Sequence, residues 1–281
     1  MEMGARRFFK GFGAVLADSI RGFNKRDGEV QAGYIAYALM LAIFPFLIFA
    51  VSLTGWMIGA ERSAEAIQVL FDFAPDYLAE VLEPEVARVL GQRHGLFTLF
   101  IVLAIWAAMR AVEAVNKSFD GIYGERAGAI WLFRKAKALV VVFGAAIVAV
   151  VLGLSILLAP VLIHLVETYT TVALPKNLLI ARYGVGFMAL YCFLWVMHWF
   201  LPNSHAQGFS IWPGAFLSTV LWVAMATGMS FYLAYAGNYS VTYGALSGIV
   251  ITLLFLYFSG AIIIFGAEFN AALRRFRERN E

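Results

Sequence analysis

Six long and nearly uninterrupted apolar runs constrain this chain more than any other feature of its sequence. Each run is long enough for a helix to cross the hydrocarbon core of a bilayer, which takes about 20 residues. Backbone amides in lipid must be paired internally, so continuous apolar runs favour helices, whereas barrel strands are about ten residues long and alternate with polar positions. The runs are 32–58, 96–115, 139–165, 178–201, 209–235 and 247–269.

The composition agrees with a chain that folds in lipid. Apolar residues make up 62% of the chain and charged residues 14%, with a mean hydropathy of +0.80, whereas soluble domains carry roughly 25% charged residues. The sequence therefore predicts an all-α polytopic membrane protein with six transmembrane helices. The single cysteine, Cys192, excludes an intrachain disulfide and a cysteine-based zinc site.

Lysine and arginine counts in the connections predict the topology. The segment before the first run, the 117–138 connection and the tail after residue 270 hold six, five and four of these residues, and the three intervening connections hold three, one and none. Basic residues accumulate in cytoplasmic connections. We therefore predict that both termini lie in the cytoplasm.

We expect three parts along the chain. Residues 1–30 form an amphipathic helix on the inner membrane surface, because apolar residues recur every three or four positions between basic ones. Residues 31–270 form the six-helix transmembrane domain, with short helices in an outer loop over 60–95, and residues 271–281 form a basic cytoplasmic tail. The apolar stripe of the first helix is Phe8, Phe12, Leu16, Ile20 and Phe23.

Charged residues toward the inner ends of two predicted spans are the main candidates for a site. Arg110 and Glu113 lie three residues apart on one helical face, and charges at this depth need a partner, water or the bundle interior. Two interpretations stay open: a polar cavity for a lipid head group or anion, and an ion pair that reaches the interface.

Glu268 and Asn270 lie at the same predicted membrane level, and we group them with Arg110, Glu113 and Asn116 as a polar cavity or a clasp. In one version Arg110 is shared between Glu113 and Glu268, which pins the second and sixth spans together. A fully satisfied cluster leaves little for a substrate, which favours the clasp.

Two further segments carry weaker signals. Pro45 removes a backbone hydrogen bond within the first span and predicts a kink there. The uncharged connection 238–248 is the most polar outward turn, and it is interpreted either as a ligand contact or as a tight turn whose polar groups pair internally. Its polar candidates are Asn238, Tyr239, Thr242 and Tyr243.

The sequence contains no pattern that indicates an enzyme. His94, His164, His198 and His205 are scattered without ligand-like spacing, so we expect no metal site. Phosphate loops, nucleophile elbows and HExxH motifs are absent, and we expect no cofactor. Grouped acid, base or metal ligands for phosphodiester hydrolysis are also missing, which argues against a ribonuclease. The net charge of +3 does not indicate nucleic-acid binding, because basic residues of a membrane protein matter through their location, and we expect no nucleic-acid partner.

Several segments resemble the bacterial YihY/virulence factor BrkB family of six-span inner-membrane proteins, formerly labelled ribonuclease BN. The likeness runs nearly end to end and is most specific near the C-terminus. The segments that carry it are Ala36-Tyr37 with Ile43 to Leu47, Ala114 to Asn116 with Gly121 to Gly124, Trp131 with Arg134 to Lys137, Trp212 to Ala215, Asn238 to Gly248, Leu256 to Gly260 and Gly266 to Asn270.

This resemblance implies a location in the bacterial inner membrane and a role in the envelope, including movement of lipids or glycolipids. We expect membrane lipids, anionic lipids or glycolipids among them, as partners. A non-transporting structural or interaction protein, for example a homodimer, and a membrane-bound ribonuclease remain as alternatives, the ribonuclease as the weakest.

Overall fold

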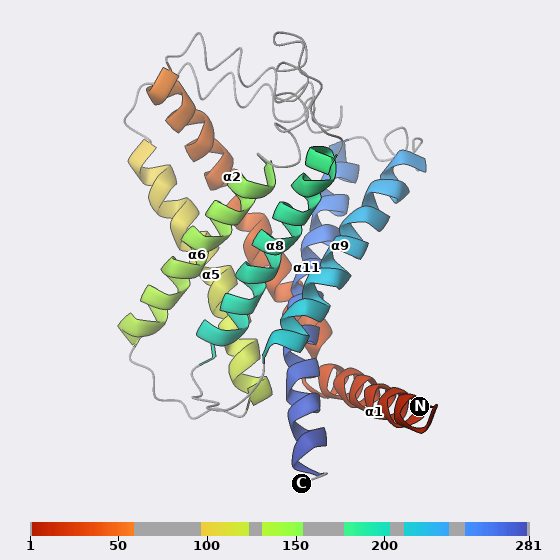
Figure 1. Ribbon diagram of the computed structural model, residues 1–281. Helices are drawn as coiled ribbons and strands as arrows, with labels where there is room; N and C mark the ends of the chain where they lie inside the picture. The colour runs from red at the N-terminus through yellow and green to blue at the C-terminus, as the bar shows by residue number, and fades with distance from the viewer. Residues whose placement is uncertain are drawn as a thin grey trace. The chain divides into compact units, whose positions relative to one another are not determined.

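The computed structural model describes residues 2–58, 97–123, 131–153, 177–202, 211–235 and 245–279, and all regular structure in these ranges is helical. Figure 1 shows the helices and their labels. They are α1 (Glu2–Lys25), α2 (Gly28–Ile58), α5 (Phe97–Tyr123), α6 (Trp131–Gly153), α8 (Asn177–Phe200), α9 (Trp212–Tyr235) and α11 (Ala245–Glu278).

The predicted all-helical membrane architecture is confirmed in the described ranges. Each of the six predicted spans overlaps one helix, and four helical stretches there are long and apolar enough to cross a membrane: Leu132–Leu152, Ala181–Phe200, Trp212–Leu233 and Gly248–Glu278. The count of six spans and the cytoplasmic termini stay predictions.

Three helices extend well beyond the predicted boundaries, and the first of them, α5, continues to Tyr123 although its span was predicted to end at residue 115. The helix α6 begins at Trp131, so the basic residues Arg134, Lys135 and Lys137 belong to a helix although we expected a connection there. The helix α11 continues to Glu278, and the predicted tail is therefore mostly its extension. Periodicity in apolar residues marks where lipid begins, but a helix can continue into water as long as its backbone bonds are kept.

Two predicted features are not decided. The helix α2 runs through Pro45 without a break, but the Pro45 side chain lies outside the described residues, so the kink stays a prediction. The outer loop over 60–95 also lies outside them.

The chain divides into two compact units, and each is described by itself. Unit 1 contains Met1–Gln31, Val115–Ala224 and Ala261–Glu281, and unit 2 contains Ala32–Ala114 and Met225–Gly260. Most of the buried polar side chains of the described ranges belong to unit 1.

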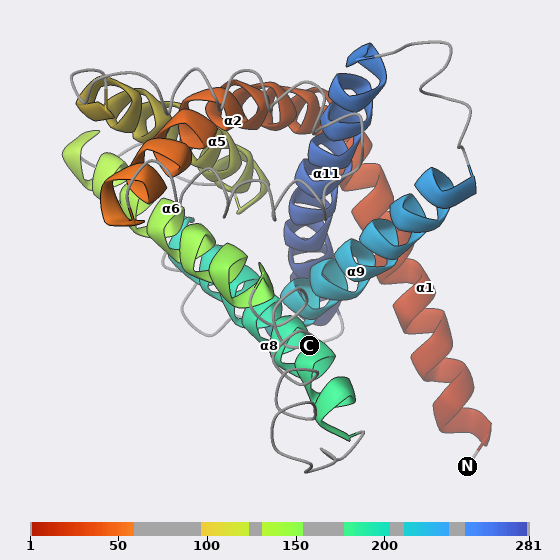
Figure 2. The same ribbon diagram turned by 90° about the horizontal axis from the view of Figure 1, so that it is seen from above.

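In unit 1, α6 and α8 lie side by side and run antiparallel (Figures 1 and 2). Gly144 packs against Phe193, and Leu152, later in α6, approaches Gly186, earlier in α8. Lys137, near the start of α6, reaches the carbonyl of Leu201 just past the end of α8. The two helices are thus in contact along most of their lengths.

A close crossing of α9 and α11 lies in the same unit. A Cβ atom on Gly214 would collide with the carbonyl oxygen of Gly266 and with Asn270, and a Cβ on Gly266 would collide with the hydroxyl of Ser218. Only glycine permits this backbone approach, which is a common way to bring membrane helices together.

The helix α1 packs along the C-terminal part of α11. Val15 is buried against Phe269 and Ala272, and the chain then turns through Arg26 and Asp27 into α2. Asp27 adopts a φ of 53°, a left-handed conformation that Asp tolerates better than most residues. This turn carries Arg26 back toward α11.

Unit 2 is built around small residues. On α5, Ala104, Ala107, Ala111 and Ala114 are all buried, and their spacing of three or four residues places them on one helical face. Gly260 of α11 lies against Ala32 and Ile35 of α2. Small residues again allow the helices to approach closely.

The α9–α11 crossing predicts a difference between two glycines of the same helix. Gly214→Ala should destabilise the protein by about 1–3 kcal/mol because the new methyl group overlaps the Gly266 carbonyl and Asn270. Gly228→Ala is the control, since nothing lies within 4 Å of the place that its methyl group would occupy, and it should be neutral or stabilising. Denaturant unfolding in detergent measures both, and equal effects would contradict the close crossing.

Candidate functional site

The best defined polar site in unit 1 is centred on Glu268 of α11. Its side chain is completely buried, and both carboxylate oxygens accept hydrogen bonds from Nη1 of Arg26, at 2.7 and 2.9 Å. The Arg26 side chain is 33% exposed. A buried carboxylate is costly without a cation, so this pair is what permits Glu268 to be charged in the helix.

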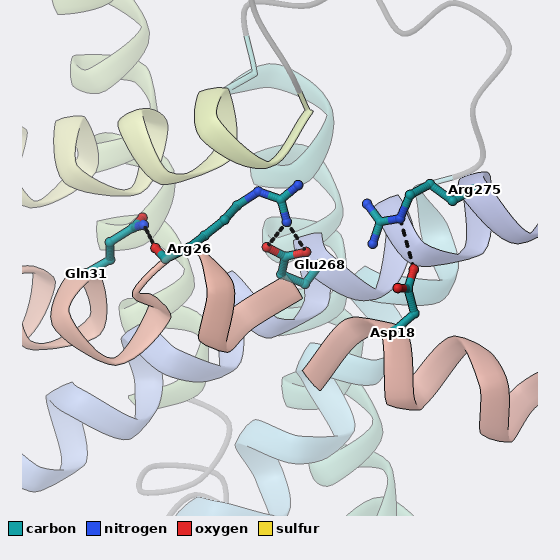
Figure 3. A network of polar contacts seen from close by, with 5 residues as sticks. All are labelled: Asp18, Arg26, Gln31, Glu268 and Arg275. Carbon is teal, nitrogen blue, oxygen red and sulfur yellow. Dashed lines mark hydrogen bonds and ion pairs between the residues drawn. The ribbon is translucent and has the colours of Figure 1, made fainter. Parts of the chain in front are cut away.

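The Arg26 backbone and a second ion pair hold α1 in place. Gln31 donates to the carbonyl oxygen of Arg26, which ties the start of α2 to the turn. Seven residues after Glu268 on α11, Nε of Arg275 donates a hydrogen bond of 2.9 Å to a carboxylate oxygen of Asp18. Figure 3 shows both ion pairs joining the N-terminal segment to α11, and we call them the α1–α11 clasp.

Gly22 explains why α1 comes so close to Glu268. A Cβ atom at this position would overlap the Glu268 carboxylate. A glycine is therefore needed where α1 passes the buried acid.

Asn270 acts as a cap for a different helix. Its Oδ1 accepts from the backbone amide of Gly214 at 2.8 Å, and its Nδ2 donates to the carbonyl of Ile211 at 3.0 Å. The first amides of a helix have no partner within the helix, and Pro213 lacks a donor altogether. Asn270 thus supplies, from α11, the cap that the start of α9 lacks in its own sequence.

At the end of α8, backbone carbonyls without a partner in their own helix accept hydrogen bonds from other helices. Asn116 of α5 donates to the carbonyl of Leu201 at 2.9 Å, and the ammonium group of Lys137 lies 3.4 and 3.3 Å from the carbonyls of Leu201 and Pro202. A cation at a helix C-terminus is favoured by the helix dipole. Lys137 is buried and also lies over the rings of Phe133 and Phe200.

His198 and Tyr123 are two further polar residues beside α11. The imidazole of His198 donates from Nδ1 to the carbonyl of Leu194 at 2.8 Å and packs on the ring of Phe119. Tyr123 lies beside Asn270 and Glu268, and burial together with the charge of Glu268 raises the pKa of its hydroxyl, so the phenol stays protonated.

Arg110 is in a very different environment. Its guanidinium lies 3.8 Å from a carboxylate oxygen of Glu113, and the side chains are 50% and 28% exposed. The guanidinium also lies 5.9 Å from the ring centre of Trp106, which is itself 52% exposed. The Arg110–Glu113 pair is therefore longer and more exposed than the Arg26–Glu268 pair.

The residues that we grouped from the sequence belong to two different units. Glu268, Asn270 and Asn116 are buried in unit 1 and make specific hydrogen bonds, whereas Arg110 and Glu113 belong to unit 2. The partner of Glu268 is Arg26, and not Arg110 as one version of the predicted cluster had it. The polar turn with Asn238, Tyr239, Thr242 and Tyr243 lies outside the described residues.

Sequence reasoning missed Arg26 and Lys137 as site residues because both looked like ordinary basic residues of cytoplasmic connections. A signal was present for Arg26: Glu268 lies in an apolar segment and requires a cation. Which of the many basic residues supplies it depends on the turn between α1 and α2, and no local pattern indicates that.

In the described part of the chain, no group of three or more His, Cys, Asp or Glu side chains is placed to hold a metal ion. The polar side chains assembled there cap helices and pair charges.

Comparison with known proteins identifies the family. The family model for virulence factor BrkB matches residues 19–281. The chain belongs to the virulence factor BrkB family. The matched region includes the Arg26–Glu268 pair of the α1–α11 clasp, the α9 cap and Arg110, and it begins one residue after Asp18.

Individual relatives of the BrkB family are distant but nearly full length. The chain is 26% identical over 269 residues to the putative ribonuclease-like protein YfkH of Bacillus subtilis, covering 93% of this chain and 96% of that protein. It is 24% identical to a UPF0761 membrane protein of Pseudoalteromonas atlantica, covering 90% and 83%. It is 25% identical to one of Coxiella burnetii, covering 93% of both. No solved structure matches.

The burial of Glu268 predicts an unequal response to mutation. Arg26→Gln should cost about 3 kcal/mol, because it leaves a fully buried carboxylate without a partner. Glu268→Gln should cost less, since the partly exposed Arg26 side chain can reach water, and the double variant should be more stable than Arg26→Gln alone.

The matched control is Arg274→Gln. Arg274 and Glu278 form a pair of the same 2.7 Å length but 47% and 57% exposed, so its loss should change stability by at most about 0.5 kcal/mol. Denaturant unfolding in detergent compares these four variants with the wild type. Equal losses for Arg26→Gln and Arg274→Gln would contradict the structural importance of the buried pair.

Proposed function

We propose that this BrkB-family membrane protein resides in the bacterial inner membrane, binds a lipid or lipid-linked envelope precursor by its anionic head group, and moves it between the leaflets. The proposal rests on one observation above the others: Arg110 is half-exposed and loosely paired within an apolar helix.

The loose geometry leaves Arg110 available. At 3.8 Å the Arg110–Glu113 pair lies beyond hydrogen-bond distance, and the guanidinium also lies over the Trp106 ring. An arginine at this depth needs hydrogen-bond acceptors. The two oxygens of a phosphate match the planar guanidinium fork.

The aromatic neighbour suits the same ligand. Tryptophan is favoured at the level of lipid head groups, where its ring meets acyl chains and its N–H meets water. Trp106 and Arg110 are four residues apart on α5, so their side chains share one face. Together they offer an apolar surface and a cation to an amphipathic ligand.

The buried cluster of unit 1 supports a scaffold role for its own residues. Glu268 is paired by Arg26, and Asn270 and Asn116 cap α9 and α8. Groups with such partners are poor candidates for binding a substrate. We therefore place the head-group contact at Arg110 and the structural clasp at Glu268, although the sequence grouped them.

A second candidate function follows from that satisfied cluster. A non-transporting protein that organises envelope complexes, as a homodimer or with another partner, would need a stable polar core and no path for a substrate. The ribonuclease-like name belongs to the Bacillus subtilis relative, and we do not extend it to this chain.

The test is native mass spectrometry of the protein released from its own membranes. Wild-type protein should retain a defined anionic lipid, and Arg110→Ala should reduce its retention at least roughly tenfold, the effect of losing a charge-assisted contact. Arg110→Lys should fall between them because the bidentate geometry is lost. In reconstituted vesicles, Arg110→Ala should also abolish movement of that lipid while the protein remains folded.

Lys117→Ala is the matched control, because Lys117 is an exposed cation on the same helix seven residues later. Its lipid retention should equal that of the wild type. Only nonselective bulk lipid, unchanged by Arg110→Ala, would contradict head-group binding and favour the structural role. Lipid movement at the normal rate in the Arg110→Ala variant would contradict the transport role.

A further inference from the structure

The helix α1 presents two different faces. The residues Val15, Ser19 and Gly22 recur four and three positions apart, which places them on one side of the helix. All three are buried. This side contacts α11, and Arg26 follows four positions later to pair with Glu268. The docked side of α1, the side that packs on α11, is therefore the one that carries Val15, Ser19 and Gly22.

An apolar edge of α1 remains uncovered beside the docked side. Phe12 is 45% exposed and Ile20 is 48% exposed, with the partly exposed Leu16 midway between them. Their spacing of four residues puts the three side chains in one row. Phe12 also touches Phe269 of α11, with ring centres 5.9 Å apart, so the row begins at the contact with α11 and leads away from it.

The side of α1 that faces away from this row is positively charged: at 3.6 residues per turn, Arg21 and Lys25 lie roughly 100° and 140° around the helix from Ile20. Arg21 and Lys25 are exposed, four residues apart, and neither is paired with a carboxylate in the described part of the chain. Asp18, the acidic residue between Gly11 and Lys25, is neutralised by Arg275. The exposed end of α11 and the residue after it add Arg277 and Arg279. An anionic partner is therefore favoured.

We propose that the row Phe12, Leu16 and Ile20 of α1 inserts between the head groups of the cytoplasmic leaflet while Arg21 and Lys25, on the polar side of the helix, attract its anionic lipids. The occupant is a lipid surface of anionic composition. An apolar row opposite a face with lysine and arginine is the pattern of helices that lie in a membrane interface.

A second copy of the chain fits this face less well. Stable interfaces bury about 800 Å² on each partner, more than a row of three partly exposed side chains offers. The small area of the row favours lipid as the occupant.

The α1–α11 clasp holds α1, and with it the row of apolar side chains, in one orientation relative to α11. Arg26–Glu268 and Asp18–Arg275 hold the helix at both ends of its docked side (Figure 3). The lipid contact of α1 is thus fixed relative to α11. It is independent of head-group binding at Arg110, so either proposal can fail without the other.

Spin labels on α1 test the orientation. In a Cys192→Ala background, which removes the exposed native cysteine, a single cysteine replaces Ile20 in one variant and the exposed Ala14 in another. In vesicles of phosphatidylcholine and phosphatidylglycerol, the Ile20 label should be reached by oxygen and shielded from a water-soluble nickel complex. The Ala14 label, on another side of α1, should show the reverse.

Charge reversal tests the anionic partner. Arg21→Glu and Lys25→Glu should each raise the nickel accessibility of the Ile20 label, by roughly fivefold in the equilibrium between inserted and exposed helix. The change should vanish in vesicles of phosphatidylcholine alone. Thermal unfolding should match the wild type because the α1–α11 clasp is untouched, and lipid retention through Arg110 should also be unchanged.

Two results would overturn the proposal. An Ile20 label that is open to the nickel complex in both kinds of vesicle would show that this row faces water. Strong dipolar coupling between Ile20 labels of two chains would identify a second copy as the occupant.

Discussion

The burial of one carboxylate in a membrane helix is the constraint on which the described part of unit 1 depends. Glu268 has no exposed surface, and the free energy of an unpaired charge in such a place is unfavourable by several kcal/mol. Its pairing with Arg26 therefore determines where the turn between α1 and α2 must lie. Gly22 is required in α1 for the same reason, because any side chain there would overlap the acid. A single electrostatic requirement thus positions the N-terminal helix.

The other buried polar groups solve a related problem, which is how helices end inside a low-dielectric environment. The start of α9 and the end of α8 expose backbone amides and carbonyls that their own segments do not pair. Asn270 caps the first, and Asn116 together with Lys137 caps the second. Each cap comes from a different helix, so the same bonds that satisfy the backbone also hold the helices together. A mainly apolar interface would lack this specificity, since lipid competes equally for apolar contacts.

Two charged pairs of the chain differ in how accessible their side chains are to a ligand. Arg26 and Glu268 are close and shielded, whereas Arg110 and Glu113 are farther apart and accessible. A pair of the first kind contributes to the fold, and an arginine of the second kind can exchange its weak partner for a phosphate. The membership in the BrkB family is compatible with either role, because the relatives are named as membrane proteins without a shared reaction.

The sequence by itself determined the class of the protein, since apolar runs of this length can satisfy their backbone in lipid only as helices. It also identified Glu268, Asn270 and Asn116 as polar residues that need partners, and Arg110 with Glu113 as neighbours on one helix face. Only the tertiary structure decided who the partners are. Arg26 is 242 positions from Glu268, and Lys137 reaches the end of α8 only because α6 and α8 run antiparallel. Periodicity reports which side of a helix is buried, whereas the choice of a distant partner depends on how turns and crossings bring the helices together.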